Sequence, residues 1–237
     1  MLTGNHSLTL ALLLIVFLII SSCQKETVEP SCPPLADTFA PTFTQALFLD
    51  LAFGEEFGQS SDQLRKWNNN IQFFIKGSAD STVLKEITAT VAELNTLSTQ
   101  VNIVEVTSES DANLLIFLGT KTDYVTNVEP SAAGIAEGNS GFVAIAWNNQ
   151  NEIIRSSVCI DVVNFNSTDL LRHVIREELA QSLGLINDTD LDETSIFHQF
   201  IDANQSYSEM DRKMITYMLG NELQAGMCKR EVMGLVD

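Results

Sequence analysis

The sequence predicts an α/β (α+β) fold: a mixed, mostly antiparallel-edged sheet packed by a long helix and a second helix, plus C-terminal helices. Three observations predict it. Short apolar runs typical of strands flank a long stretch of helical periodicity. Two of these runs are separated by a short polar turn. A second amphipathic segment, ended by a glycine, follows the last strand, and further helical periodicity lies near the C-terminus.

The N-terminal residues carry an export signal. Residues 8–20 are an apolar run of signal-peptide length, too short for a comfortable membrane span. The run leads into Ile20-Ser21-Ser22-Cys23, which resembles the bacterial lipobox, whose cysteine carries a diacylglycerol lipid and becomes the new N-terminus. The alternative is a short membrane anchor that is never cleaved. The predicted organisation is a signal peptide over residues 1–22, a lipid-anchored flexible tether over residues 23–35, and a folded domain over residues 36–237.

Composition restricts the partners. The chain has 31 acidic and 13 basic residues, a formal net charge of −18, which argues against nucleic acid and anionic lipid headgroups as partners. The membrane would be contacted through the lipid on Cys23. Gln24 after Cys23 removes one cue for inner-membrane retention. We therefore expect an outer-membrane lipoprotein of the bacterial cell envelope, facing the periplasm or the cell surface.

Three further cysteines follow the lipobox. An exported protein meets oxidising conditions, so one disulfide among Cys32, Cys159 and Cys228 is expected, with one thiol left over. All three pairings remain open. Cys159 lies in a predicted strand, where a buried and inert thiol is expected.

The first half of the domain combines helices and strands. Apolar residues within 39–57 recur at helical spacing, and residues 71–76 form an apolar run that predicts the first strand. Residues 78–81 offer caps for an amphipathic helix that ends near Thr96. Two more strands are predicted over residues 101–106 and 112–118.

The second half contains a hairpin and the C-terminal helices. Residues 124–140 are rich in glycine, serine, asparagine and alanine, which predicts a loop across a sheet edge. Residues 148–151 form a polar turn between strands. The remaining predicted elements are strands over 141–147 and 153–163, a helix over 170–183 capped within 167–169, an acidic loop over 186–194, a turn or short helix over 195–200, and a last helix over 208–219.

The helix over residues 170–183 carries the most informative motif. It keeps the frame His-Glu-x-x-His-x-x-Gly-x-x-His of zinc peptidases without any of the three histidines. Glu177, Gln181 and Asn187 stand at the histidine positions. Glu178 stands at the general-base position, and Gly184 keeps the glycine. In a working zincin two histidines one helical turn apart hold the zinc, and the glutamate activates the bound water.

The replacements change the metal chemistry. Glu177, Gln181 and Asn187 offer oxygen ligands, which suit calcium or magnesium better than zinc. His173, one turn before Glu177, either joins these residues in a metal site or is hydrogen-bonded to that carboxylate. His198 lies on a later segment, and no feature of the sequence directs it to the helix. No metal cofactor is expected, with zinc or calcium as the alternatives.

Glu178 needs a partner if it is buried. Burial raises the pKa of a carboxyl unless a cation or a hydrogen-bond donor satisfies it. Arg172 and Arg176, on the same helix, are the nearest candidate cations.

The chain resembles the family named domain of unknown function 2927, over roughly residues 64–227. Members are mostly bacterial lipoproteins without an established activity. The similarity of that family to metzincin-type peptidases implies that Ser195-Ile196-Phe197 takes the place of the Ser-x-Met turn under the zinc, with Phe197 replacing the methionine. Asp188 would also belong to the cleft. The motifs that carry the resemblance are Leu64-Arg-Lys-Trp67, Ala112-Asn113, Glu177-Glu178-x-x-Gln181-x-Leu183-Gly184-Leu185-x-Asn187-Asp188, Ser195-Ile-Phe197, Met210-Asp211, Met214-Ile215 and Leu223-x-x-Gly226-Met227.

Loss of all three ligand histidines with the frame intact predicts a lipid-anchored, zincin-like domain that has lost peptidase activity. Such a domain would bind a peptide, a protein or a cell-envelope component along the former cleft. The alternative is an active hydrolase in which Glu178 works with an atypical metal site.

Overall fold

The computed structural model describes residues 32–35, 40–54, 61–136, 138–165, 167–200 and 203–237. The folded unit begins at Cys32. Residues 1–22, Cys23 and the predicted domain start at residue 36 lie outside the described residues. Within the described part of the chain, no helix is long and apolar enough to cross a membrane.

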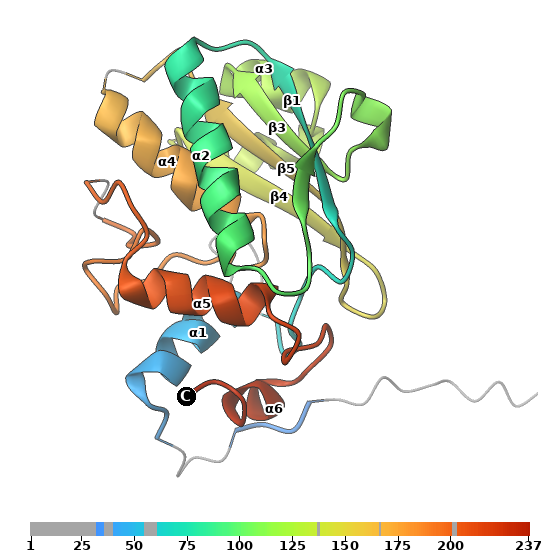
Figure 1. Cartoon of the computed structure of the whole chain (residues 1–237), viewed down its shortest axis with the longest axis vertical. Coiled ribbons are helices and arrows are strands. Elements are labelled where there is room, and N and C mark those ends of the chain that lie inside the picture. The colour runs from blue at the N-terminus through green and yellow to red at the C-terminus, as the bar shows by residue number, and fades with distance from the viewer. Residues whose placement is uncertain (1–31, 36–39, 55–60, 137, 166, 201–202) are drawn as a thin grey trace, which may run out of the picture. The chain divides into compact units, whose positions relative to one another are not determined.

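A five-stranded sheet with the order β2-β1-β3-β5-β4 forms the centre of the domain (Figure 1). Antiparallel pairing is confined to edge strand β4, which pairs with β5, and the other neighbours are parallel. The mixed sheet and the hairpin turn at residues 148–151 are confirmed. The strands are β1 (Ile71–Gly77), β2 (Ile103–Glu105), β3 (Leu114–Gly119), β4 (Gly141–Trp147) and β5 (Ile153–Asp161).

Helices pack on the sheet and below it (Figure 1). The long helix α2 lies against α4, the helix that carries the motif, and α4 in turn contacts β4 and β5. Asp80 and Ser167 cap these two helices with side-chain oxygens, as residues 78–81 and 167–169 predicted. The α-helices are α1 (Phe43–Phe53), α2 (Ser81–Leu97), α3 (Lys121–Asn127), α4 (Thr168–Gln181), α5 (Glu209–Leu219) and α6 (Lys229–Met233).

The core divides into two clusters. The larger one joins β1 and β3 to α1, α2, α4 and α5, and the smaller one includes Phe117, Tyr124, Phe142 and Cys159. Ile116 and Phe117, neighbours in β3, belong to different clusters because successive side chains of a strand point to opposite faces. Helices therefore cover both faces of the sheet.

The loop predicted over residues 124–140 is wrong in its first half. Helix α3 and a 3-10 helix, η2 (Pro130–Gly134), occupy this part of the chain, and a short 3-10 helix, η1 (Glu109–Asp111), precedes β3. Thr120 begins α3 by accepting a hydrogen bond from the backbone N–H of Asp123, at 3.1 Å. Tyr124 is fully buried, and its hydroxyl lies 2.7 Å from Ser157 Oγ.

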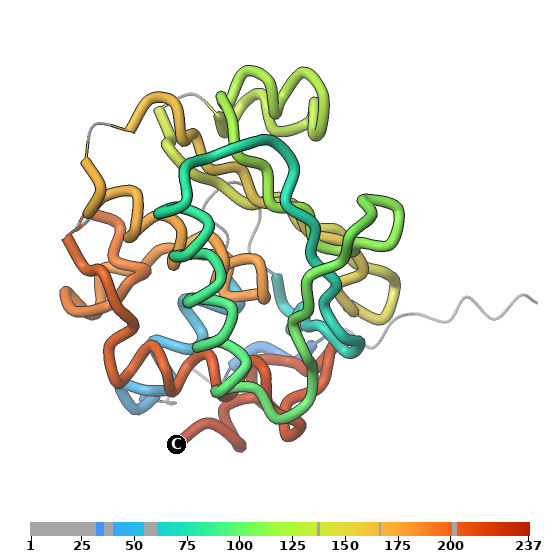
Figure 2. Tube along the Cα trace, turned by 45° about the horizontal axis from the view of Figure 1, so that its top comes forward, coloured from blue at the N-terminus to red at the C-terminus, as the bar shows by residue number. Residues whose placement is uncertain are grey.

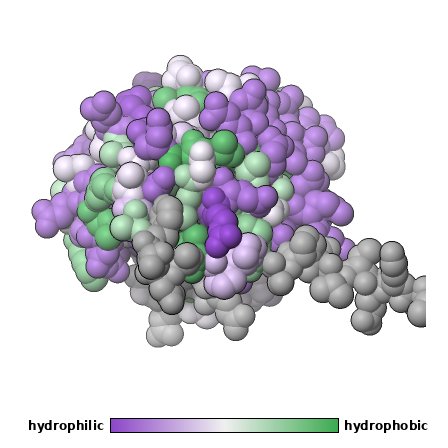
Figure 3. Space-filling model, turned by 90° about the horizontal axis from the view of Figure 1, so that it is seen from below, coloured by the Kyte–Doolittle hydropathy of each residue, from purple (hydrophilic) through white to green (hydrophobic). Residues whose placement is uncertain are grey.

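The two ends of the described chain meet. Gln45 of α1 donates to the carbonyls of Met233 and Val236, at 2.9 and 3.1 Å, so that α1 and α6 lie side by side (Figures 1 and 2). The face seen in Figure 3 mixes hydrophobic and hydrophilic residues in small patches. Helix α6 was not predicted from the sequence.

A disulfide joins Cys32 to Cys228, the residue that precedes α6. This pairing is one of the three that the sequence left open. Cys159 is free and buried in β5, as expected, and burial raises the pKa of its thiol to about 12. A thiol with so high a pKa forms almost no thiolate at neutral pH and is therefore inert.

Candidate functional site

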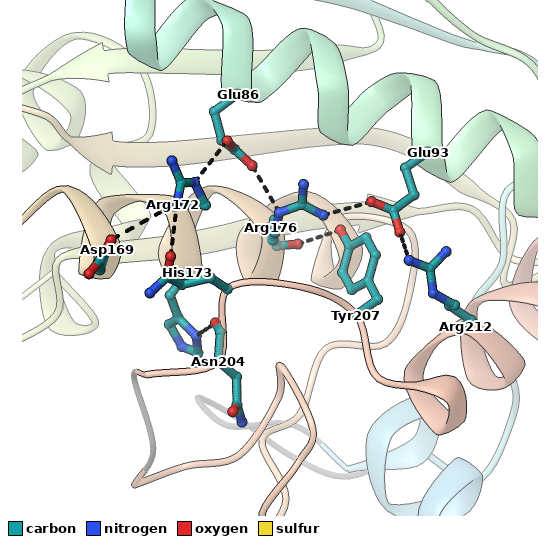
Figure 4. Close-up of polar contacts among 10 residues, drawn as sticks. Glu86, Glu93, Asp169, Arg172, His173, Arg176, Asn204, Tyr207 and Arg212 are labelled. Atoms are coloured by element: carbon teal, nitrogen blue, oxygen red, sulfur yellow. Dashed lines mark hydrogen bonds and ion pairs between the residues drawn. The ribbon is translucent and has the colours of Figure 1, made fainter.

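One side of α4 is bound to α2 by ion pairs (Figure 4). Arg172 Nε lies 3.1 Å from Glu86 Oε2, and Arg176 Nε lies 2.9 Å from Glu86 Oε1. Arg176 also contacts Glu93 Oε2 at 2.7 Å, and Arg212 of α5 pairs with the same carboxylate. Arg172 and Arg176, the nearest candidate partners of Glu178 in the sequence, contact the carboxylates of α2 instead.

The other side of α4 lines a cavity of about 220 Å³. Its wall combines α4, the segment that enters β4, and the segment that follows Gly184. The deep residues, among them His173, Glu178 and Gln181, are buried, whereas Gly138, Ser140 and Gln199 at the rim are exposed, so the cavity opens to solvent. The lining residues are Gly138, Asn139, Ser140, Gly141, Leu170, His173, Val174, Glu177, Glu178, Gln181, Asp188, His198 and Gln199.

Gly141 determines how closely α4 approaches β4. A Cβ atom at this position would lie 2.4 Å from Val174 Cγ1 and 2.6 Å from Glu178 Oε1, inside van der Waals contact. The absence of a side chain at Gly141 allows Glu178 to lie against the first residue of β4. Glu178 is only 5% exposed there. The general-base position of the motif is thus in the cavity wall.

His173 and Glu177 contact each other on the cavity side of α4. His173 Nδ1 donates to the backbone carbonyl of Asn204 at 2.7 Å (Figure 4). Its Nε2 lies 3.3 Å from Glu177 Oε2. The i, i+4 spacing brings the two side chains together. Of the two readings open from the sequence, the contact between His173 and a carboxylate is present.

The other two ligand positions diverge. Gln181 Nε2 donates to Asp188 Oδ1 at 2.8 Å, so that Asp188, like Gln181, belongs to the cavity wall. Asn187 turns toward α1, where its Nδ2 donates to Asp50 Oδ1 at 3.3 Å and its Cγ is packed on Gly54. Asn187 does not line the cavity.

The Ser-Ile-Phe turn belongs to the core and does not line the cavity. Ser195 Oγ donates to Asp211 Oδ1 at 2.6 Å, and the N–H of Ile196 donates to the other oxygen of the same carboxylate at 2.9 Å. Phe197 is fully buried. Because buried Asp211 at the start of α5 fixes the turn, the next residue, His198, is fixed as well.

His198 lines the cavity, although no feature of the sequence directed it there. A backbone bridge pairs it with Thr189, and the ring is 7% exposed. Its Nδ1 accepts a hydrogen bond from the N–H of Phe200 at 3.2 Å. In the neutral ring the proton therefore lies on Nε2.

The side chains of this site do not fit a catalytic zinc. Such a zinc needs three protein ligands, usually including neutral imidazoles whose coordinating nitrogen has no proton. His173 Nε2 faces the Glu177 carboxylate at 3.3 Å, and in the neutral ring His198 Nε2 carries its proton. Across the described ranges, no group of three or more His, Cys, Asp or Glu residues is arranged to hold a metal ion.

Comparisons with known proteins identify the family. The model of a family described as protein of unknown function (DUF2927) matches residues 42–237, and the chain therefore belongs to this family. Two solved structures of myroilysin are similar at 12% identity, with TM-scores of 0.42 and 0.44. They cover 64% and 65% of this chain, and 93% and 86% of their own. No curated protein matches the sequence.

Proposed function

We propose that this member of the family is a lipid-anchored protein of the bacterial cell envelope whose zincin-like domain binds a ligand in the α4 cavity without cleaving it. The ligand would be a peptide, a protein or another envelope component. The membrane would be contacted through a diacylglycerol on Cys23.

The arrangement of the motif residues carries the proposal. Where a zinc peptidase directs ligands at one point, Glu177 contacts His173, Gln181 contacts Asp188, and Asn187 is turned toward α1. These contacts stabilise a polar cavity beside α4. Polar groups around an open cavity orient a ligand by hydrogen bonds.

The disulfide supports export. Disulfides persist in oxidising compartments such as the periplasm and the cell surface. The chain contains such a bond between Cys32 and Cys228. It also shortens the proposed tether. Cys32 follows Cys23 by nine residues, so the bonded end of the domain would stay within about 30 Å of the lipid, given about 3.3 Å per extended residue.

A capture experiment tests the proposal. The full-length protein in detergent is incubated with a solubilised envelope fraction, and bound material is compared with that of a Glu177→Ala/Gln181→Ala variant. Glu109→Gln, at an exposed ion pair outside the cavity, is the matched control. We expect the wild type and the control to capture the same component intact and the double variant to lose it.

The alternative function gives a different result. Glu178 is the residue type of a general base and lies in the cavity wall. Cleavage of the captured component, abolished by Glu178→Ala, would contradict the binding proposal and support an active hydrolase. Equal capture by the wild type, the Glu177→Ala/Gln181→Ala variant and the Glu109→Gln control would also contradict the binding proposal.

A further inference from the structure

The described N-terminal segment, residues 32–35, is joined to the folded domain chiefly by its disulfide. Neither core cluster includes a residue of this segment. Among the described residues, the segment has one hydrogen bond, in which Arg230 Nη2 donates to the Pro34 carbonyl at 3.3 Å in an exposed position. One exposed hydrogen bond does not offset the conformational entropy lost by ordering four residues. The position of the segment therefore depends on the bond between Cys32 and Cys228.

Helix α6, at the other end of the disulfide, is held independently of that bond. Val232, Met233 and Val236 are buried. Gln45 of α1 donates to the carbonyls of Met233 and Val236. Cys228 itself belongs to neither core cluster. Breaking the disulfide should therefore release residues 32–35 and leave the folded domain in place.

The disulfide lies at the surface of the domain. Cys32 and Cys228 are both only half-buried. A cavity of about 250 Å³ beside Cys32 is lined by residues 32–35, Asp62 and Lys229. Structural disulfides of exported proteins resist reduction, whereas exposed disulfides are reduced more easily and can be regulatory. A thiolate from solvent thus has a path to this bond that does not pass through the core.

The disulfide also decides where the tether joins the domain. With the bond formed, nine residues separate Cys23 from Cys32, a reach of at most about 30 Å at about 3.3 Å per residue. Without the bond, the next residue held by a described contact of a helix is Thr42, which caps α1. Thr42 follows Cys23 by nineteen residues, so the reach rises to about 63 Å.

We propose that the Cys32–Cys228 disulfide is a redox switch that sets how far the domain extends from the membrane. A thiolate of a protein dithiol would attack one sulfur atom and form a mixed disulfide, and the other cysteine would leave as a thiolate and take up a proton. The second thiol of the dithiol would then displace the attacked cysteine. The dithiol loses two electrons and two protons, and Cys32 and Cys228 become thiols. The inference rests on the proposed function only in placing the lipid on Cys23.

A bilayer experiment tests the switch. The full-length lipidated protein is placed on a supported phosphatidylcholine bilayer, and neutron reflectometry records the distance of the protein layer before and after treatment with dithiothreitol, a small dithiol. We expect the mean distance to increase by about 8 Å, because the end-to-end distance of a coil grows with the square root of its length. Cys32→Ser/Cys228→Ser should show the larger distance without dithiothreitol. Cys159→Ser, which removes the buried free thiol, should respond as the wild type does.

Two measurements on the wild type accompany the distance. Titration of thiols under native conditions should find two new thiols after treatment, and the near-UV circular dichroism should not change. Three results would overturn the inference: two new thiols without a change of distance, a disulfide that dithiothreitol reduces only after denaturation, or loss of the near-UV signal on reduction. None of these measurements needs a variant, so misfolding of a mutant leaves the test intact.

Failure of the proposed function is distinguishable from failure of the switch. A protein that does not attach to the bilayer would refute the lipid anchor. The switch would then be tested in solution, where reduction should increase the maximum dimension measured by small-angle X-ray scattering, and an unchanged dimension would overturn it. A redox-dependent distance without ligand capture at α4 would refute only the binding proposal.

Discussion

At the scale of single residues, Gly141 controls the contact between α4 and the sheet. Gly141→Ala would place a Cβ atom 2.4 Å from Val174 Cγ1 and 2.6 Å from Glu178 Oε1. We expect the free energy of unfolding to fall by about 1–3 kcal/mol, the usual cost of overpacking, measured by urea denaturation.

Gly134 provides the matched control. A Cβ atom there meets no atom within 4 Å, so Gly134→Ala should leave stability unchanged or raise it slightly. Equal losses in the two variants would show that the contact at Gly141 is unimportant.

Lys66 is a second residue with a measurable effect. It is fully buried, and its Nζ donates to the Met218 carbonyl at 2.6 Å, near the C-terminus of α5, where a cation is favourable. Burial nevertheless lowers the pKa of Lys66 from 10.5 to about 8. Between these values the unfolded chain binds more protons than the native chain, so this group makes stability rise with pH.

We compare the free energies of unfolding of the wild type and of Lys66→Met. The wild-type value minus the variant value should rise by about 3 kcal/mol from pH 8 to pH 10.5. The subtraction is needed because the pKa of Cys159, raised from 9.0 to about 12, makes stability fall over an overlapping range. Denaturation curves at several pH values give the difference. A difference independent of pH would contradict the burial of a neutral lysine.

The sequence predicts the site residues that share one helix better than those on loops. His173, Glu177 and Gln181 lie on one side of α4 because helical spacing requires it. Asn187 and His198 depend on the path of the chain after Gly184, which has a positive φ of 115°. That path is fixed by contacts distant in sequence, such as the one with Asp50, which spacing does not reveal.

At the scale of elements, the ion pairs between α2 and α4 hold the cavity-bearing helix in place. Glu93 contacts Arg176 and also Arg212 of α5, and its side chain is only 18% exposed. Glu93→Gln would leave two arginines without that charge. We expect a loss of about 1–3 kcal/mol, because hydrogen bonds to charged, partly buried groups are lost, measured by thermal or urea unfolding.

An exposed pair serves as the comparison. Lys76 and Glu109 lie 2.9 Å apart with side chains 35% and 50% exposed. Glu109→Gln should cost about 0.5 kcal/mol or less, since solvent screens such pairs. If Glu109→Gln lowered the free energy of unfolding as much as Glu93→Gln, burial would not explain a difference between the two ion pairs.

Elements with strong periodicity were predictable, and short ones were not. The spacing of Val83, Ile87, Val91 and Leu94 predicts α2, because one apolar face of a long helix repeats in the sequence. Helix α3 buries only Tyr124, so its sequence shows no repeat of apolar residues at helical spacing. Helix α6 has five residues and follows a disulfide cysteine, so its position depends on tertiary contacts.

At the scale of the whole molecule, Cys32–Cys228 links positions 196 residues apart. Closing so long a loop removes much of the entropy of the unfolded chain. Cys228→Ser should lower the free energy of unfolding by about 2–5 kcal/mol, and so should Cys32→Ser. Combining both changes should add nothing further, because the same bond is lost. Additive losses in denaturation experiments would contradict this account.

We propose that the α4 cavity binds a ligand without a catalytic zinc. The most direct test is the zinc content of the full-length protein, purified without chelators and measured by mass spectrometry of the metal. We expect no stoichiometric zinc in the wild type and no change in Glu177→Gln. One zinc per chain, lost in Glu177→Gln and accompanied by peptide cleavage that Glu178→Gln abolishes, would contradict it.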